Sequence, residues 1–260
     1  MDKLINFTKR NLKEVSRDPL IYIFCIGFPV VMLILFQIIN KYSNGQTTMF
    51  ELTSLIPAII MFSYTFVMLT MALLVSKDKQ TSFLKRLFSS PMKHYHFVIG
   101  YAIVGVLIGL AQTIICILIG YVFSLITQVA FISFGQILLL ILSQLPILLV
   151  NTFKGILFGT FFNDKSAPGV CSVFISLSGV LGGCWMPLEA MGGFATFCKF
   201  LPFYPSVYIG KITTNAINIL GNIYTFDTTA IIGIVTIFAY LIISLILTFV
   251  AFKKFMVNDN

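Results

Sequence analysis

The sequence predicts an all-α membrane protein with six transmembrane helices, an N-terminal interfacial amphipathic helix, and outer re-entrant helices between spans five and six. Three observations predict this fold. The chain of 260 residues is 58% hydrophobic and only 10% charged, whereas soluble domains are roughly 45–50% apolar and about 25% charged. The charged residues separate long apolar runs. Lysine and arginine collect in alternate connections between those runs, and no series of short alternating strands suggests a barrel.

The same numbers exclude several classes of protein. A mean hydropathy of +0.99 rules out a soluble globular domain, a disordered chain and a nucleic-acid-binding protein, despite the formal net charge of +8. Six helices of about 20 apolar residues each occupy nearly the whole chain. We therefore expect one transmembrane domain over residues 1–260, with no room for a soluble catalytic domain.

The boundaries of the spans follow from the charge-free runs, because a charged side chain is costly to bury in lipid. The run over residues 94–153 is too long for one helix, and turn-forming residues mark a break within 127–135. The first span is longer than the apolar core of a signal peptide, so we expect it to be retained. The predicted spans are Leu20–Ile39, Leu52–Ser76, Phe97–Ile126, Gln136–Phe162, Ser166–Leu188 and Thr228–Phe252.

The distribution of basic residues predicts the orientation. The segments before the first span and after the second carry five lysines or arginines each, and three more follow the fourth and sixth spans. The alternate connections hold only Lys41, Lys199 and Lys211. Because basic residues collect on the cytoplasmic side, both termini are predicted to be cytoplasmic in a multi-pass protein of the cell membrane.

Residues 1–18 form the predicted interfacial helix. At about 100° per residue, Leu4, Ile5, Phe7, Leu12 and Val15 share one arc, and the basic residues, Arg10 among them, lie opposite. Such a helix lies flat on the inner membrane surface, with its apolar face in lipid and its cations toward anionic head groups. The alternative is a short basic segment that only sets the topology.

Residues 76–95 are the longest cytoplasmic connection and contain a short predicted helix that Pro91 ends. Phe83, Leu84, Leu87 and Phe88 share one face of this helix. An apolar face exposed to the cytoplasm fits a groove on a partner protein. The alternative is that these residues dip into the bilayer.

Residues 187–227, on the outer side, are strongly apolar for a connection of that length. Short helices that return into the membrane and pack on protein explain this composition, and an aromatic belt on a flat loop is the alternative. The residues that mark this outer segment and its approach are Trp185, Pro187, Glu189, Pro202, Pro205 and Tyr208.

Together these features resemble the membrane subunit of ABC type-2 transporters, a permease family that includes bacterial exporters of drugs, antimicrobial peptides and polysaccharides. The resemblance covers essentially the whole chain. It is carried by KQTSFLKRLFSSPM at residues 79–92, GCWMPLEAM at 183–191 and LPFYPSVY at 201–208. The chain departs from the family pattern at Lys79 and Gln80, which replace the acidic residue and the glycine that usually precede the threonine.

The resemblance implies a coupling helix over Thr81–Ser90 that docks on a separate ATPase, and outer re-entrant helices that cap the transport path. It also implies a dimer of six-span subunits, either two copies or this chain with a sister permease, above two ATPase copies in a bacterial membrane. No GxxxxGK[ST] loop is present, so we expect no cofactor in this chain and ATP and Mg²⁺ in the partner. The implied docking residues are Thr81, Phe83, Leu84, Leu87, Phe88, Ser89 and Pro91.

Polar residues within the spans are candidates for the transport path. Lys154 is the only charged one, and ionisable residues inside a membrane are functional candidates by default. Its side chain either extends toward the inner surface or faces a cavity and meets an anionic group of the substrate. Asn151, Gln144 and Gln112 are uncharged candidates for the same path, although most such residues bond neighbouring helices.

The sequence predicts no catalytic residues and no metal site, because no suitable cluster accompanies His94 and His96. Cys184 and Cys198 can pair only if the outer segment folds back.

We therefore expect the membrane-spanning subunit of an ATP-driven exporter and not an enzyme. Its substrate would be amphipathic or hydrophobic: a drug, an antimicrobial or toxin peptide, or a lipid-linked molecule. The alternatives are a non-pumping immunity or scaffold protein that binds a peptide or lipid, and a secondary transporter. The lack of a proton-relay chain in the spans counts against a proton-coupled transporter.

Overall fold

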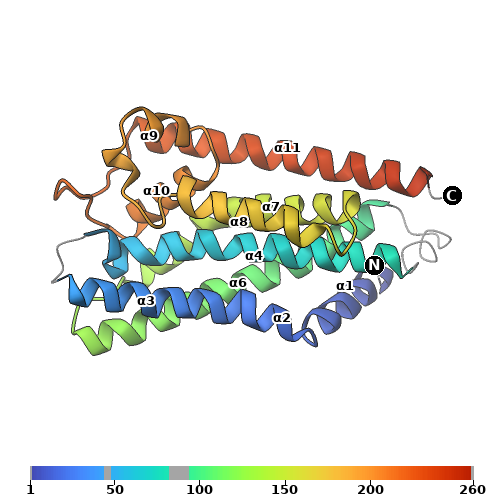
Figure 1. Ribbon diagram of the computed structural model, residues 1–260, viewed down its shortest axis with the longest axis horizontal. Helices are drawn as coiled ribbons and strands as arrows, with labels where there is room; N and C mark the ends of the chain where they lie inside the picture. Colours follow the sequence, from blue (N-terminus) through green and yellow to red (C-terminus); the bar gives the residue numbers. More distant parts are fainter. Residues whose placement is uncertain (1, 44–47, 82–93, 259–260) are drawn as a thin grey trace.

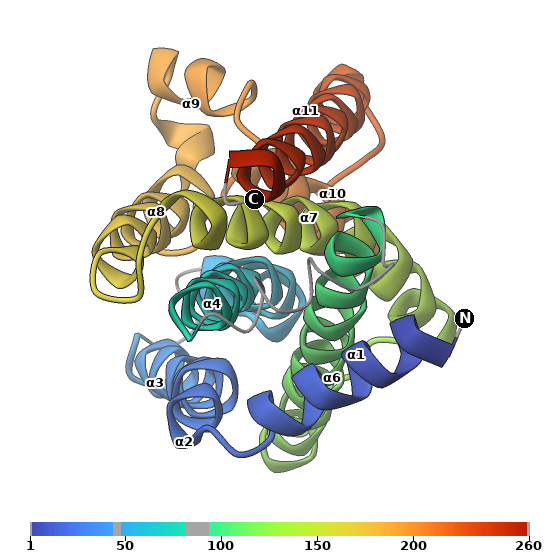
Figure 2. The ribbon, with the colours of Figure 1, turned by 90° about the vertical axis from the view of Figure 1, so that its right-hand side faces the viewer.

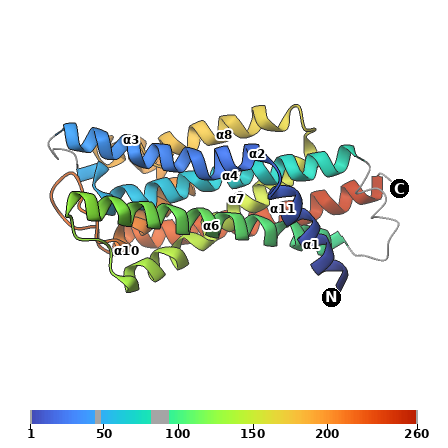
Figure 3. The same cartoon turned by 90° about the horizontal axis from the view of Figure 1, so that it is seen from below.

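The computed structural model describes residues 2–43, 48–81 and 94–258. In these residues the chain forms an elongated bundle of long helices (Figure 1). Helix α1 (Asp2–Val15) crosses one end of the bundle obliquely, and both chain termini lie toward that end (Figure 3). The described part of the chain contains no strand, apart from an isolated bridge between Ile217 and Ile223.

Five helical stretches of the described residues are long and apolar enough to cross a membrane: Tyr22–Tyr42, Leu52–Gln80, Tyr95–Thr127, Phe134–Phe161 and Thr228–Lys254. They coincide with five of the six predicted spans. In chain order, the elements after α1 are α2 (Pro19–Ile21), the π-helix η1 (Tyr22–Gly27), α3 (Phe28–Tyr42), the 3₁₀-helix η2 (Thr48–Phe50), α4 (Leu52–Gln80), α6 (His94–Thr127), α7 (Phe134–Phe161), α8 (Ala167–Leu181), the 3₁₀-helix η3 (Leu188–Ala190), α9 (Gly193–Cys198), α10 (Phe203–Thr213) and α11 (Thr228–Asn258).

The remaining predicted span, Ser166–Leu188, is only partly helical. Helix α8 has 15 residues, about 22 Å at 1.5 Å per residue, and ends at the pair Gly182 and Gly183. Gly183 has a φ of +67°, a left-handed conformation that glycine adopts without steric cost and that commonly ends helices. The length of α8 alone therefore does not establish a sixth crossing.

Helix α4 is the centre of the bundle. It packs against α3, α6, α7, α8 and α10, and Figure 2 shows it surrounded by other helices when the bundle is viewed from its end. Within the most apolar 18-residue stretch of α4, 89% is buried inside the protein, compared with 22% of the corresponding stretch of α11. Two glycines of α7 allow close contact with α4, since a Cβ at Gly155 or Gly159 would come within 2.4 and 2.6 Å of the carbonyl oxygens of Met68 and Ala72.

The predicted break between the third and fourth spans is confirmed. Helix α6 ends at Thr127 and α7 begins at Phe134. Ser133 caps α7 in a capping box, in which its hydroxyl accepts from the Gln136 backbone and the Gln136 side chain accepts from the Ser133 backbone.

Candidate functional site

The predicted docking segment lies almost entirely outside the described residues. Of its assigned side chains only Thr81 is described; Phe83, Leu84, Leu87, Phe88, Ser89 and Pro91 lie outside the described part of the chain. Thr81 ends α4, and its hydroxyl donates to the carbonyl oxygens of Lys77 (3.1 Å) and Asp78 (3.3 Å). The helix ends on either side of the segment, in α4 and α6, lie at the end of the bundle that α1 crosses (Figure 1).

Lys79, where the chain departs from the family pattern, joins α4 to the end of α7. Its ammonium group donates to the carbonyl oxygens of Thr160 (2.9 Å) and Phe162 (3.2 Å). These carbonyls lie at the C-terminus of α7, where the helix dipole favours a cation. The basic residue at this position therefore has a structural partner that an acidic residue could not have.

An ionic network around a buried carboxylate, called here the inner network, joins Arg10, Glu14, Asp78 and Tyr101. The carboxylate of Asp78 is 1% exposed, and its Oδ2 accepts hydrogen bonds from Arg10 Nη1 and Tyr101 Oη, each 2.6 Å long. Arg10 Nη2 lies 2.6 Å from Glu14 Oε2. Burial lowers the pKa of Arg10, but the hydrogen bond to Asp78 and the charges of Asp78 and Glu14 raise it, and the net shift is upward.

Arg10 therefore corrects the sequence-based description of α1, which directed every cation of this helix toward lipid head groups. A carboxylate that is buried away from water requires a nearby cation. For Asp78 this cation is Arg10 of α1. The apolar residues of α1 also differ in burial. Phe7 and Val15 are 5% exposed and face the protein, whereas Ile5 (46%) and Leu12 (38%) remain exposed.

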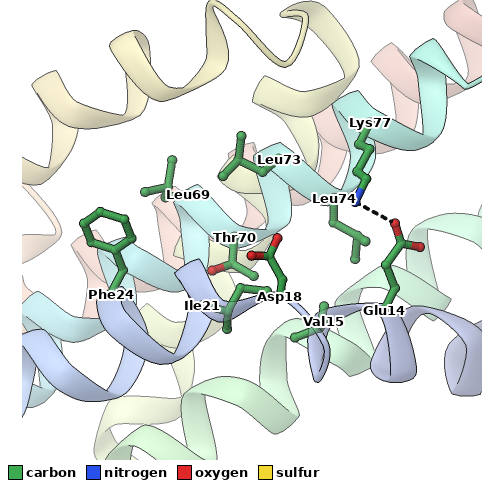
Figure 4. A pocket seen from close by; sticks show the side chains of 10 residues that line it. All are labelled: Glu14, Val15, Asp18, Ile21, Phe24, Leu69, Thr70, Leu73, Leu74 and Lys77. Carbon is green, nitrogen blue, oxygen red and sulfur yellow. Dashed lines mark ion pairs between the residues drawn. The ribbon is translucent and has the colours of Figure 1, made fainter.

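A narrow groove runs beside the inner network, between α4 and the segment from α1 to η1 (Figure 4). The ion pair between Lys77 Nζ and Glu14 Oε1, 3.4 Å apart, lies at one end of it. Its volume is about 50 Å³, far below the roughly 300–1,000 Å³ of pockets that hold drug-sized ligands. The groove is therefore too small for a drug-sized ligand in this conformation. Its lining is Glu14, Val15, Asp18, Ile21, Phe24, Leu69, Thr70, Leu73, Leu74 and Lys77.

Lys154 lies in α7, and its Nζ contacts two aromatic rings from other helices. The ammonium nitrogen is 5.2 Å from the ring centre of Phe203 in α10 and 5.5 Å from that of Tyr240 in α11. Such cation–π contacts stabilise a charge without neutralising it. Among the described residues, no carboxylate lies within ion-pair distance of Lys154.

The three uncharged path candidates make contacts between or within helices. Gln144 uses both ends of its amide on Ser206 of α10: its Nε2 donates to the carbonyl oxygen (2.9 Å) and its Oε1 accepts from the hydroxyl (2.8 Å). Asn151 donates to the carbonyl of Ile147 one turn earlier in α7. Gln112 donates to the carbonyl of Cys25 in η1 (2.7 Å). These three residues are at most 1% exposed.

A second ionic group, called here the outer network, joins Lys211, Glu189 and Tyr224 in the outer segment. The hydroxyl of Tyr224 donates to Glu189 Oε1 (2.5 Å) and lies 3.3 Å from Lys211 Nζ, which is itself 4.0 Å from the carboxylate. Burial lowers the pKa of Lys211, although the charge of Glu189 opposes this shift. Burial raises the pKa of Tyr224, and the charge of Glu189 raises it further.

The other predicted outer residues support the helices around this network. Trp185 stacks on Phe36 at 5.0 Å between ring centres, and the rings of Tyr208 and Tyr224 lie 5.2 Å apart. Pro187 and Pro202 precede η3 and α10. Pro205, in the first turn of α10, packs on Gly233 of α11. Cys184 and Cys198 are both buried and free, so they form no disulfide.

The sequence-based predictions did not identify which charged residues pair in either network. Glu189 was singled out for its place in the outer motif, but its partner Lys211 was treated only as a topological exception, and Asp78 was not considered. A partial signal was present: Asp78 is the one acidic residue in residues 76–95 and follows a long apolar run directly. Lys77 and Lys79 flank it, so the sequence alone does not identify the cation that pairs with it.

Long apolar helices packed around α4, with polar networks near both ends, define a helical multi-pass membrane protein. The sequence model of the ABC-2 type transporter family matches residues 3–213, a region that begins in α1 and ends with α10. The chain belongs to this family, so it is the membrane permease component of an ABC transporter. Such permeases have no ATPase of their own and work with an ABC ATPase subunit. No curated protein matches the chain.

Proposed function

We propose that this chain is the membrane-spanning subunit of an ATP-driven exporter of amphipathic or hydrophobic substrates, in a bacterial cell membrane. The observation that carries the proposal is the family match over residues 3–213. Two copies of a separate ABC ATPase bind ATP and Mg²⁺ and drive it. A second copy of the chain, or a sister permease, completes the path.

The positions of the termini support six crossings with both termini in the cytoplasm. Five crossings would leave the two ends of the chain on opposite sides of the membrane, but α1 and the end of α11 lie toward the same end of the bundle (Figure 1). Counting α8 with the turn that follows it as the fifth span restores an even number. Most of the basic residues belong to connections at that same end, which supports a cytoplasmic assignment.

The depth of α10 supports its assignment as an outer re-entrant helix that caps the path. Its first residue, Phe203, reaches the ammonium group of Lys154, the twenty-first residue of α7. Its last turn returns toward the start of α4, where Thr214 donates to the carbonyl of Thr53 (2.6 Å). A helix buried on protein at this depth satisfies the constraint that a membrane places on irregular backbone.

The proposal is tested by reconstitution. The tagged chain is expressed with the ABC ATPase encoded beside it, purified and placed in vesicles, where ATP turnover and movement of a fluorescent amphipathic peptide are measured. We expect the ATPase to co-purify and the peptide to move only with ATP and Mg²⁺. Failure of any ABC ATPase to co-purify would contradict the proposal. Binding of the peptide without ATP-dependent movement would favour a non-pumping immunity protein.

The docking role of residues 81–91 has its own test. We expect Leu84→Asp combined with Leu87→Asp to abolish co-purification of the ATPase, because two carboxylates cannot enter an apolar groove without a large desolvation cost. The matched control is Leu220→Asp, at a leucine in the outer segment that is 78% exposed. This control should leave the complex intact, and unchanged binding by the double variant would remove the docking role.

We also propose that Lys154 provides a counter-charge for an anionic group of the cargo. The support is its position among rings with no carboxylate partner in the described residues. Lys154→Gln should slow export of a peptide with a free carboxylate by about tenfold, equivalent to about 1.4 kcal/mol, and leave its methyl ester unaffected. Lys154→Arg should retain both activities. An equal loss for the acid and the ester would contradict this role.

A further inference from the structure

We infer that Asp78 is a positioning residue that holds α1, the end of α4 and the start of α6 together as one unit. Through this unit, a displacement of the docking segment would reach α1 and the first span that follows it. The transmission of movement rests on the proposed function. The attachment of α1 to α4 does not.

The position of Asp78 makes it suited to this task. It lies two residues before the end of α4 and three before Thr81, the first of the assigned docking residues. Its Oδ2 receives one donor from α1 and one from α6, at 2.6 Å each. Three helices therefore meet at one carboxylate oxygen, and Figure 2 shows α1 crossing α6 at this end of the bundle.

An apolar contact fixes α1 to α6 beside the carboxylate. Phe7 packs on Phe97 and Tyr101, with ring centres 5.4 and 5.0 Å apart. It lies over Gly100, where a Cβ would come within 2.5 Å of the Phe7 ring. Tyr101 therefore makes two contacts: its ring packs on Phe7, and its hydroxyl donates a hydrogen bond to Asp78. Helix α1 can hardly move on this surface without disturbing the hydrogen bonds to Asp78.

Two polar atoms beside Arg10 take no part in the hydrogen bonds of the inner network. Asp78 Oδ1 and Asn11 Nδ2 are both buried and have no hydrogen-bond partner among the described residues. One is an acceptor and the other a donor, and both side chains already contact Arg10 Nη1, at 2.6 and 2.8 Å. Within the described residues, the attachment of α1 and α6 to Asp78 therefore depends on the single oxygen Oδ2.

The attachment is tested by the distance between spin labels at Lys9 of α1 and Leu107 of α6, both exposed. The native cysteines are buried, so introduced surface cysteines are labelled preferentially. We expect a single narrow distance in the parent protein and a broad distribution in Asp78→Asn, which keeps the size of the side chain and removes its charge. Arg10→Lys, which keeps the cation, should stay narrow. An unchanged narrow distance in Asp78→Asn would overturn the inference.

Transmission is tested in the reconstituted complex. In Asp78→Asn we expect the ATPase to co-purify as before, while stimulation of ATP turnover by the fluorescent amphipathic peptide falls at least fivefold. Lys9→Gln, on the same helix but outside the network, is the matched control and should stay within twofold of the parent. Loss of thermal stability with normal stimulation would show a merely structural role and overturn the inference.

Two further outcomes distinguish failure of this inference from a failure to fold and from failure of the proposed function. If Asp78→Asn does not reach the membrane, Tyr101→Phe removes one donor only, and stimulation should fall about twofold with a broader label distance; no change in either would overturn the inference. If no ATPase co-purifies with the parent chain, the proposed function fails, while the label distance still decides whether Asp78 attaches α1 to the bundle.

Discussion

The inner and outer networks use the same kinds of groups with the burial reversed. At the inner network the side chain of Asp78 is 1% exposed and that of Arg10 is 35% exposed. At the outer network the side chain of Lys211 is 7% exposed and that of Glu189 is 22% exposed. The more buried ion cannot regain water when its partner is removed. The cation should therefore matter most at the inner network, and the anion at the outer one.

The contacts differ as well. Arg10 and Asp78 touch directly at 2.6 Å, whereas Lys211 and Glu189 are 4.0 Å apart and share the hydroxyl of Tyr224. A direct charged hydrogen bond is stronger than an attraction through a neutral hydroxyl. The inner network is thus expected to hold its helices together more strongly than the outer one.

The largest effect is expected for Arg10→Ala. This change leaves the buried Asp78 carboxylate with Tyr101 as its remaining hydrogen-bond donor among the described residues, so the unfolding free energy should fall by about 3 kcal/mol, in the range for breaking a buried pair. Asp78→Asn should cost only about 1 kcal/mol, because Arg10 can turn toward water and Glu14. Chemical unfolding in detergent micelles measures both. Equal losses of unfolding free energy for the two variants would contradict the argument that the less buried partner matters more.

At the outer network the order should be inverted. Glu189→Gln keeps an acceptor for Tyr224 but leaves Lys211 without its opposing charge, so we expect a loss of about 2 kcal/mol. Lys211→Met replaces the buried ion with an apolar chain of similar length and should change stability by about 0.5 kcal/mol or less. The same unfolding measurement applies, and a larger loss for Lys211→Met than for Glu189→Gln would refute the burial argument.

A neutral contact provides the reference for both networks. Gln144→Leu removes the two hydrogen bonds to Ser206, and we expect a loss of about 1 kcal/mol, since such bonds between membrane helices average about 0.6. A double-mutant cycle with Ser206→Ala isolates the pair. If the coupling energy of Gln144 with Ser206 equalled that of Arg10 with Asp78, the charges of the inner network would contribute nothing beyond neutral hydrogen bonds.

A small effect on stability is also expected for Lys154→Met. Its ammonium group contacts the rings of Phe203 and Tyr240, and cation–π contacts contribute about 0.5–1 kcal/mol at exposed sites. The unfolding free energy should therefore fall by less than 1 kcal/mol. A loss of several kcal/mol would identify Lys154 as a structural residue and leave no stability-neutral variant for testing its role in export.

Much of the fold could be predicted from residue order. The break after Thr127 followed from a local cluster of turn residues, and Ser133 caps the next helix as such residues do. The length of α8 could not be predicted from apolar content, because the apolar run continues past Gly183, where backbone conformation and not hydropathy ends the helix. The candidate site was predicted as a segment, and most of its side chains lie outside the described residues.

The sequence by itself determined the membrane class, the principal spans and the sorting of charges, because the cost of placing a charge in lipid acts on each residue separately. Only the tertiary structure decided which charges are paired. Arg10 and Asp78 are 68 positions apart, and nothing in the local pattern of either residue identifies the other. Their contact arises because α1 packs on α6 beside the end of α4, which brings a buried carboxylate within reach of a helix that its own pattern assigns to the membrane surface.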